Sequence, residues 1–497
     1  LKQILMKHIF SNLLSRYIPV WNQENPALAN TVLRLIRNTG IWHSQSLGLH
    51  WVAKFAIICF ISTNLTQVVS LVIHRDDSTR MFEIFSVLSF CGMGTLKLFN
   101  LYTNRKRWAS IITQVNYLEH EQLHGKLLSR IDSGIEEDYS PQIIAKYTQR
   151  HTFISSILLR LYSITAIVFI ATPFVEYAVT ADASYYPHIL PGWAPLDNVG
   201  FTGYFLTLIF EIVASVYCVF VHVAFDCTSV GIMIFICGQF SLLRRKTEDI
   251  AGSGKDCMPS TKRDARAHLR IIESHGTHTA LCTISKELDT VLRGILGVYF
   301  MVATLTVCSV AVRLSSEILS FMQLVSLLQY MAGTLTQLFL FCRYGDAVFH
   351  ESSFNMGEGP FGAAWWSLCP RMRRQLAMLG AGMMRPRTLH AGPFNKLDLP
   401  SFVQASVFNF YVFLLFIYIR VPYLKRKKRN PYRITRASVC LSVCLSVCLS
   451  VCLSVCLSVC LSVCLSVCLS VCPSVTADFL RNYWTNQVEI WYTYVSL

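Results

Sequence analysis

The chain has 497 residues, of which 53% are apolar and 15% are charged, and its formal net charge is +15. A mean hydropathy of +0.43 excludes a string of soluble domains and indicates a polytopic membrane protein. Much of the positive charge lies in the links between apolar runs, where it acts as an orientation signal, so we expect no nucleic-acid partner. The predicted fold class is all-α, with several transmembrane helices in a lipid bilayer.

Seven apolar runs are long enough to cross about 30 Å of hydrocarbon as helices. They lie at about 51–73, 81–102, 153–180, 199–225, 294–312, 318–342 and 402–420. Residues 1–50 form an N-terminal segment whose amphipathic stretch at 33–42 predicts a helix along the inner membrane surface. Residues 51–420 then form one seven-helix domain, and a basic tail follows at 421–437.

Lys and Arg alternate in abundance from one link to the next. The links 1–50, 103–152, 226–293 and 343–401 together carry 29 of these residues, whereas 74–80, 181–198 and 313–317 carry 3. The positive-inside rule therefore predicts a cytoplasmic N-terminus and, after seven spans, an extracellular C-terminus. This orientation is the reverse of that of a G-protein-coupled receptor.

The second outer link and its flanks, residues 176–205, contain three prolines, several aromatic residues and no Lys or Arg. Proline restricts the backbone and aromatic side chains suit an interface, so the segment could form a lid over the bundle. An aromatic belt at the level of the lipid headgroups is the alternative.

The fourth apolar run is too long for one crossing, since apolar residues continue past Phe225 to Leu243. We expect this continuation to pack against protein, including the basic links. Glu211 and Asp226 interrupt the run, and a carboxylate inside a membrane span is a candidate functional group. For Asp226, a hydrated position near the cytoplasmic boundary is the alternative interpretation.

The sequence contains no motif of a catalytic or phosphate-binding site, so we expect neither an enzyme nor a bound cofactor. It also contains no CxxC pair, and His350 beside Glu351 has no second His or Cys at ligand spacing. We therefore predict no metal site.

Two segments resemble the insect odorant receptor family. They are QLFLFCRYGDAVFHES at 337–352 and LHAGPFNKLDLPSF at 389–402. The family's characteristic positions fall on Cys342, Gly345, Glu351, Ser352, Phe361, Trp365 and Phe402, with Phe361 standing where the family usually has Tyr. The resemblance covers about 30–420 and is most specific over 337–402.

This resemblance implies a subunit of a ligand-gated, non-selective cation channel in the plasma membrane of a sensory dendrite. Such a subunit assembles with an odorant co-receptor into a hetero-oligomer, expected to be a tetramer, and binds a volatile molecule in the outer half of the bundle. Aromatic residues at that depth are the candidate ligand contacts. They are Phe85, Phe90, Phe169, Phe174, Tyr177, Tyr204, Phe205 and Phe321.

The last predicted span departs from the family pattern, which commonly has a Ser-Tyr-Ser core followed by aromatic residues. A pore needs small or polar groups, and Ser406, Asn409 and Tyr411 are the candidates here. Residues 438–472 then repeat SVCL eight times and end in SVC, which we interpret as a translated DNA microsatellite. We hypothesise that the chain from about Ala405 derives from intron read-through, so that 473–497 is a non-native tail.

Three other classes remain as alternatives. A gustatory-type chemoreceptor shares the implied fold, but its Thr-Tyr and Gln-Phe signature in the last span is missing. A G-protein-coupled receptor requires an extracellular N-terminus. A secondary transporter would show inverted repeats and interrupted helices at the membrane midplane.

Overall fold

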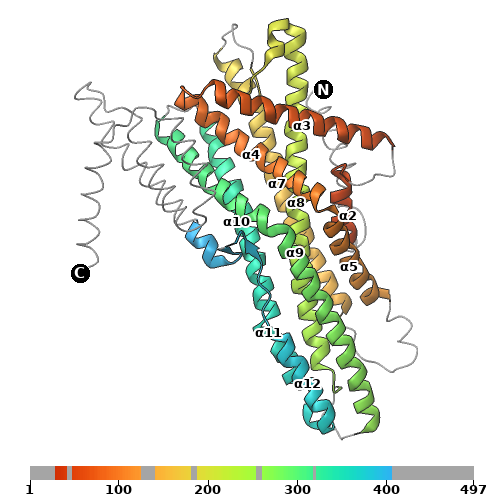
Figure 1. Ribbon diagram of the computed structural model, residues 1–497. Helices are drawn as coiled ribbons and strands as arrows, with labels where there is room; N and C mark the ends of the chain where they lie inside the picture. The colour runs from red at the N-terminus through yellow and green to blue at the C-terminus, as the bar shows by residue number, and fades with distance from the viewer. Residues whose placement is uncertain are drawn as a thin grey trace, which may run out of the picture.

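The computed structural model describes residues 28–41, 47–124, 140–180, 187–252, 260–316, 321–393 and 395–405. Nearly all of this part of the chain is helical (Figure 1). Its α-helices are α2 (Leu28–Asn38), α3 (Leu47–Ile73), α4 (Ser78–Thr103), α5 (Arg105–His124), α7 (Ser140–Thr180), α8 (Phe201–Glu248), α9 (Thr261–Ser316), α10 (Phe321–Ser352), α11 (Phe354–Gly362) and α12 (Pro370–Met383). Short 3₁₀ turns occur at η1 (Pro195–Val199) and η2 (Trp365–Ser367), and β1 (His390–Ala391) pairs antiparallel with β2 (Asn395–Lys396).

Six of the described helices, α3, α4, α7, α8, α9 and α10, are long and apolar enough to cross a membrane. They correspond to the first six predicted spans, although α8 and α10 begin at Phe201 and Phe321, slightly after the predicted starts at 199 and 318, and α7, α8, α9 and α10 run well beyond the predicted bounds. Hydropathy detects only the apolar section of a helix, whereas backbone hydrogen bonding continues through polar residues that pack against neighbours. Most of the seventh predicted span, 402–420, lies outside the described residues.

Helix α8 is the centre of the bundle and contacts α2, α3, α4, α7, α9, α10 and α11. Every residue from Val221 to Ile236 is buried. A helix that is apolar on all sides must be surrounded by other elements. The structure therefore confirms that the apolar continuation of the fourth run packs against protein.

The extended ends of α8 and α9 are covered by α11 and α12 (Figure 1). The β1–β2 hairpin, in which His390 pairs with Lys396, lies against α9. Gly392 N in its turn donates a hydrogen bond to Arg293 O of α9 at 2.8 Å. Much of this half of the molecule is formed by the links predicted to be basic. The described residues of these links are therefore mostly helical and not simple connections between spans.

Four of the residues assigned to the family motif pack within this region. Cys342 is fully buried, and Gly345 lies so close to the hairpin that a Cβ there would overlap the carbonyl oxygen of Leu397. Ser352 Oγ accepts a hydrogen bond from Arg387 N at 2.9 Å. Phe402 packs edge-on against Phe339 of α10, with ring centroids 5.4 Å apart.

The remaining three motif residues lie nearer the surface. Glu351 is half-buried next to Ser352 at the end of α10. Phe361 and Trp365 are 55% and 48% exposed. Their large exposed rings contribute apolar surface to the α11–α12 region.

Candidate ligand-binding cavity

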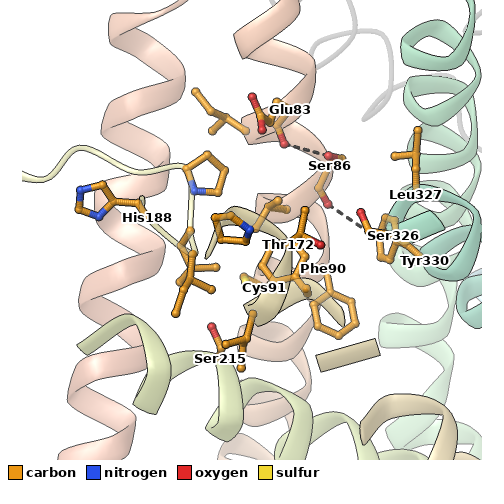
Figure 2. A pocket seen from close by; sticks show the side chains of 18 of the residues that line it. Glu83, Ser86, Phe90, Cys91, Thr172, His188, Ser215, Ser326, Leu327 and Tyr330 are labelled. Carbon is orange, nitrogen blue, oxygen red and sulfur yellow. Dashed lines mark hydrogen bonds between the residues drawn. The ribbon is translucent and has the colours of Figure 1, made fainter. Parts of the chain in front are cut away.

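A cavity of about 410 Å³ lies between α4, α7, α8 and α10, and the outer link closes one side of it (Figure 2). The residues that line it recur at three- and four-residue spacing along each helix, because one face of each helix is turned inward. On α4 these include Glu83, Ser86, Val87 and Phe90. The volume is within the usual range for small-molecule sites, about 300–1,000 Å³.

Aromatic rings form the inner part of the cavity. Phe90 stacks on His222 with ring centroids 4.3 Å apart and meets Tyr330 edge-on at 5.9 Å. Tyr330 Oη lies 3.2 Å from Ser89 Oγ and donates to Ser86 O at 3.3 Å. These contacts connect α4 to α10 across the cavity.

The outer link contributes residues 188–192 to the cavity wall. Glu211 of α8 fixes this segment, because Ile189 N donates to Glu211 Oε2 at 2.9 Å. The link also bonds to α3, since Trp193 N donates to Thr66 O at 3.3 Å. Residues 188–192 therefore form part of the cavity wall. The next residue, Trp193, lies outside the lining and is 50% exposed.

His188 joins the two carboxylates of this outer region. Its Nδ1 lies 3.2 Å from Glu211 Oε1, and its Nε2 lies 2.8 Å from Asp197 Oδ2. The hydrogen bond to Glu211, aided by the charge of both carboxylates, raises the pKa of His188 above its ordinary value, although partial burial opposes this. Two acceptors facing both ring nitrogens are the arrangement expected for a protonated imidazole.

Below the cavity, a buried polar network connects the same four helices. Lys97 Nζ of α4 lies 2.7 Å from Asp226 Oδ1 of α8 and 2.9 Å from His222 Nδ1. Tyr162 of α7 and Gln337 of α10 donate to Asp226 Oδ2 at 2.6 and 2.9 Å. Asp226 is fully buried, so the interpretation as a hydrated boundary residue was wrong.

The predicted aromatic residues are spread over several environments. Phe90 and Phe169 line the cavity. Tyr204 lies outside its lining and supports the outer link, because its hydroxyl donates to Pro187 O at 3.0 Å. Phe85 and Phe174 are half-buried outside the lining, and Tyr177 and Phe205 are 38% and 54% exposed.

The other predicted site residues fall outside the part of the chain that can be described. The side chain of Phe321, at the start of α10, is not among the described side chains. Ser406, Asn409 and Tyr411 lie beyond residue 405, where the description ends. The residues after them, including the repeat at 438–472, are outside it as well.

Several polar residues of the cavity were not predicted. They are Ser86, Thr165, Thr172, Ser215, Gln329 and Tyr330. A selection by aromatic character and membrane depth cannot find them, whereas the helical spacing of polar residues within apolar spans could have done so. Within the described ranges, no group of three or more His, Cys, Asp or Glu side chains is placed to hold a metal ion.

A model of the family described as 7tm Odorant receptor matches residues 77–410. Odorant receptor 13a of Drosophila melanogaster is 25% identical over 398 residues, which cover 76% of this chain and 90% of that protein. Odorant receptor 22c of the same fly is 22% identical over 400 residues, covering 76% and 94%.

Among solved structures, the insect olfactory receptor OR5 from Machilis hrabei is similar with a TM-score of 0.63 and 16% identity. The match covers 78% of this chain and 96% of that one. The same receptor in complex with eugenol is similar with a TM-score of 0.61. The chain therefore belongs to the insect odorant receptor family and is a multi-pass membrane receptor, not an enzyme.

Proposed function

We propose that the cavity binds a volatile small molecule and that this binding opens a non-selective cation channel. The observation that carries the proposal is the cavity itself, which lies inside the bundle and is lined largely by apolar and aromatic side chains. Small apolar ligands bind mainly by burial, with few polar contacts. One of the similar solved structures is a complex with eugenol, a small aromatic molecule, which supports this class of ligand.

We propose that the channel is a hetero-oligomer with the odorant co-receptor and that the assembly is a tetramer. Exposed apolar side chains on α9, α11, η2 and α12 support assembly with another subunit. They are Leu269, Ile272, Phe361, Trp365, Trp366 and Met378, each at least 48% exposed. Large exposed apolar side chains on neighbouring elements commonly mark a protein contact. The pore would be lined by Ser406, Asn409 and Tyr411 of the last span.

The proposed location is the plasma membrane of a sensory dendrite, with the N-terminus in the cytoplasm. The asymmetry of Lys and Arg between alternate links supports this orientation. An epitope tag placed before residue 28 should be detected only after permeabilisation of the cell. Detection on intact cells would contradict the orientation and would favour the topology of a G-protein-coupled receptor.

The channel is tested by expressing the chain with the odorant co-receptor and recording cation currents evoked by an odorant panel. Two chains are compared, one as it stands and one in which the residues after 405 are replaced by the last span of Odorant receptor 13a. We expect odorant-evoked current from the replaced chain. If that chain reaches the cell surface with the co-receptor and no odorant evokes a current, the proposal is wrong.

The hypothesis of intron read-through has its own test. Amplification of the mature transcript across codons 400–440 should reveal a different sequence after about Ala405. Recovery of the present sequence from mature message would refute the hypothesis.

A further inference from the structure

We propose that the cavity selects volatile molecules that carry a hydrogen-bond acceptor oxygen, as in a ketone, aldehyde or ester, and that Ser215 donates the hydrogen bond to that oxygen. This inference rests on the proposed binding of a volatile ligand and specifies its chemical class. Ser215 lies on α8 and lines the base of the cavity, below Cys91 in the view of Figure 2.

The hydroxyl group of Ser215 is buried and has no hydrogen-bond partner. Ser215 is 9% exposed, and its Oγ has no donor or acceptor within hydrogen-bonding distance. A buried hydroxyl without a partner costs about 1–3 kcal/mol. An unpaired group of this kind inside a cavity is explained if a ligand supplies the partner.

The other hydroxyl groups that line the described part of the cavity are already engaged. Thr165, Thr172 and Ser86 donate to helix carbonyl oxygens at 2.7–2.8 Å. Ser326 donates to Gln323 O at 3.3 Å, Tyr330 to Ser86 O at 3.3 Å, and Ser70 Oγ lies 3.4 Å from His74 Nδ1. Bonding back to the preceding turn is the usual state of a helical Ser or Thr. Ser215 therefore still has a proton to donate, and the matching group on a ligand is an acceptor.

The neighbours of Ser215 on the same face of α8 are either apolar or already hydrogen-bonded. A ligand that contacts this face therefore needs one acceptor oxygen, the one that pairs with Ser215. Cys218 and Val219, one turn further along α8, also line the cavity and are apolar in character. Glu211, one turn before, is occupied by the backbone of the outer link, and His222, two turns after, by Lys97. The hydrocarbon body of a ligand can then pack against Phe90, Phe169 and Tyr330.

The cavity size agrees with this class of ligand. An apolar cavity of about 150 Å³ is sufficient for benzene. The present cavity of about 410 Å³ therefore has room for a substituted benzene or a molecule of monoterpene size.

Matched pairs of probes that differ only in the acceptor test the proposal. Acetophenone and α-methylstyrene have the same shape, with the carbonyl oxygen of one replaced by a methylene group, and 2-heptanone and 2-methyl-1-heptene form an aliphatic pair. Binding to the purified full chain is measured as ligand-dependent thermal stabilisation, which reports affinity without requiring a channel. We expect each ketone to bind more tightly than its alkene.

The Ser215→Ala variant should weaken ketone binding roughly threefold to tenfold, the loss expected for one hydrogen bond between neutral groups. It should leave alkene binding unchanged or slightly tighter, because the unpaired hydroxyl is removed. The matched control is Ser229→Ala on the same helix, outside the cavity, where the hydroxyl donates to Phe225 O at 2.8 Å. This control should leave the ratio of ketone to alkene affinity unchanged.

Equal binding of ketone and alkene, or an equal effect of Ser215→Ala on both, would overturn the proposal. Binding of the alkenes without binding of the ketones would do so as well. Failure of the proposed function gives different results. If no volatile probe binds the purified chain, the proposed ligand binding is wrong. If probes bind the purified chain but evoke no current, the proposed channel opening is wrong.

Discussion

Lys97 of α4 and Asp226 of α8 form an ion pair that is buried on all sides, with side chains only 2% and 1% exposed. Tyr162, Gln337 and His222 complete the hydrogen bonding around it. The pair therefore joins α4, α7, α8 and α10 at a level below the cavity. Buried charges are tolerated when they are paired and hydrogen-bonded in this way.

Removal of one partner should be strongly destabilising. Asp226→Ala leaves the Lys97 ammonium group buried without a counter-charge, and we expect a loss of about 3–5 kcal/mol. Lys97→Met in the same background should recover part of this loss, because it removes the unpaired charge. The Tyr162 and Gln337 donors would still lack an acceptor, so the recovery should be incomplete.

Thermal unfolding of the purified chain, or the fraction that reaches the cell surface, measures these effects. The control is Asp76→Asn, because the pair of Arg75 and Asp76 is 67% and 92% exposed and should contribute little. Equal loss in Asp226→Ala and Asp76→Asn would contradict the structural role assigned to the buried pair.

The attachment of the outer link should depend on pH through His188. Because its pKa is raised in the folded protein, the imidazolium stabilises the link fully below the ordinary His pKa of about 6.5. This stabilisation is lost as the pH rises through the raised pKa. Hydrogen exchange of the Ile189 and Leu190 amides, corrected for the intrinsic rate, should therefore become faster above that pKa.

The His188→Gln variant should remove this pH dependence. Glu211 and Asp197 are the acidic groups that face His188, and both remain in the variant. If the corrected exchange rates of wild type and variant change with pH in the same way, another group is responsible.

Gly345→Ala should destabilise the packing of α10 against the β1–β2 hairpin. A Cβ at this position would overlap Leu397 O and lie 2.8 Å from Leu397 Cγ, so the backbone of one segment must move. We expect a loss of more than 1 kcal/mol in unfolding free energy. Gly333→Ala on the same helix is the control, because nothing lies within 4 Å of its Cβ.

The two alanine variants should have opposite effects. Alanine is a better helix former than glycine by about 0.5–1 kcal/mol, so Gly333→Ala should be neutral or stabilising. Thermal unfolding of the two variants against wild type measures the difference. A Gly345→Ala protein as stable as Gly333→Ala would show that the close approach is not required.

Glu119 of α5 should be needed to dock α2 onto the bundle. Its carboxylate accepts hydrogen bonds from Leu28 N at 3.2 Å and Ala29 N at 3.0 Å, in the first turn of α2. A carboxylate at a helix N-terminus also interacts favourably with the helix dipole. Tyr147 Oη donates to the same group at 3.0 Å.

Glu119→Ala leaves these donors without a partner, and we expect a loss of about 1–3 kcal/mol. Proteolysis within α2 should become faster in this variant. Glu121→Ala, an exposed position on the same helix, is the matched control and should have little effect. Equal proteolysis of α2 in both variants would rule out the docking role.

The class of the molecule follows from composition and hydropathy alone. Runs of about 20 apolar residues cannot be explained by a soluble protein, and six of them lie in helices long enough to cross a membrane. The motif over 337–402 was sufficient to suggest the family that the comparison then showed. The apolar excess after Phe225 likewise predicted that α8 would be enclosed by protein, because an apolar surface outside the membrane has to be covered.

The cavity and the buried network depended on the packing of the helices. Phe90 and Phe169 face the cavity whereas Phe205 does not, and membrane depth cannot distinguish them, since the rotation of each helix about its axis is set by its neighbours. Lys97 and Asp226 are 129 residues apart in the chain, and no local pattern links them. The packing of α4 against α8 brings the two charges into contact. Each charge can remain buried because the other compensates for its loss of hydration, so the pair depends on the tertiary structure.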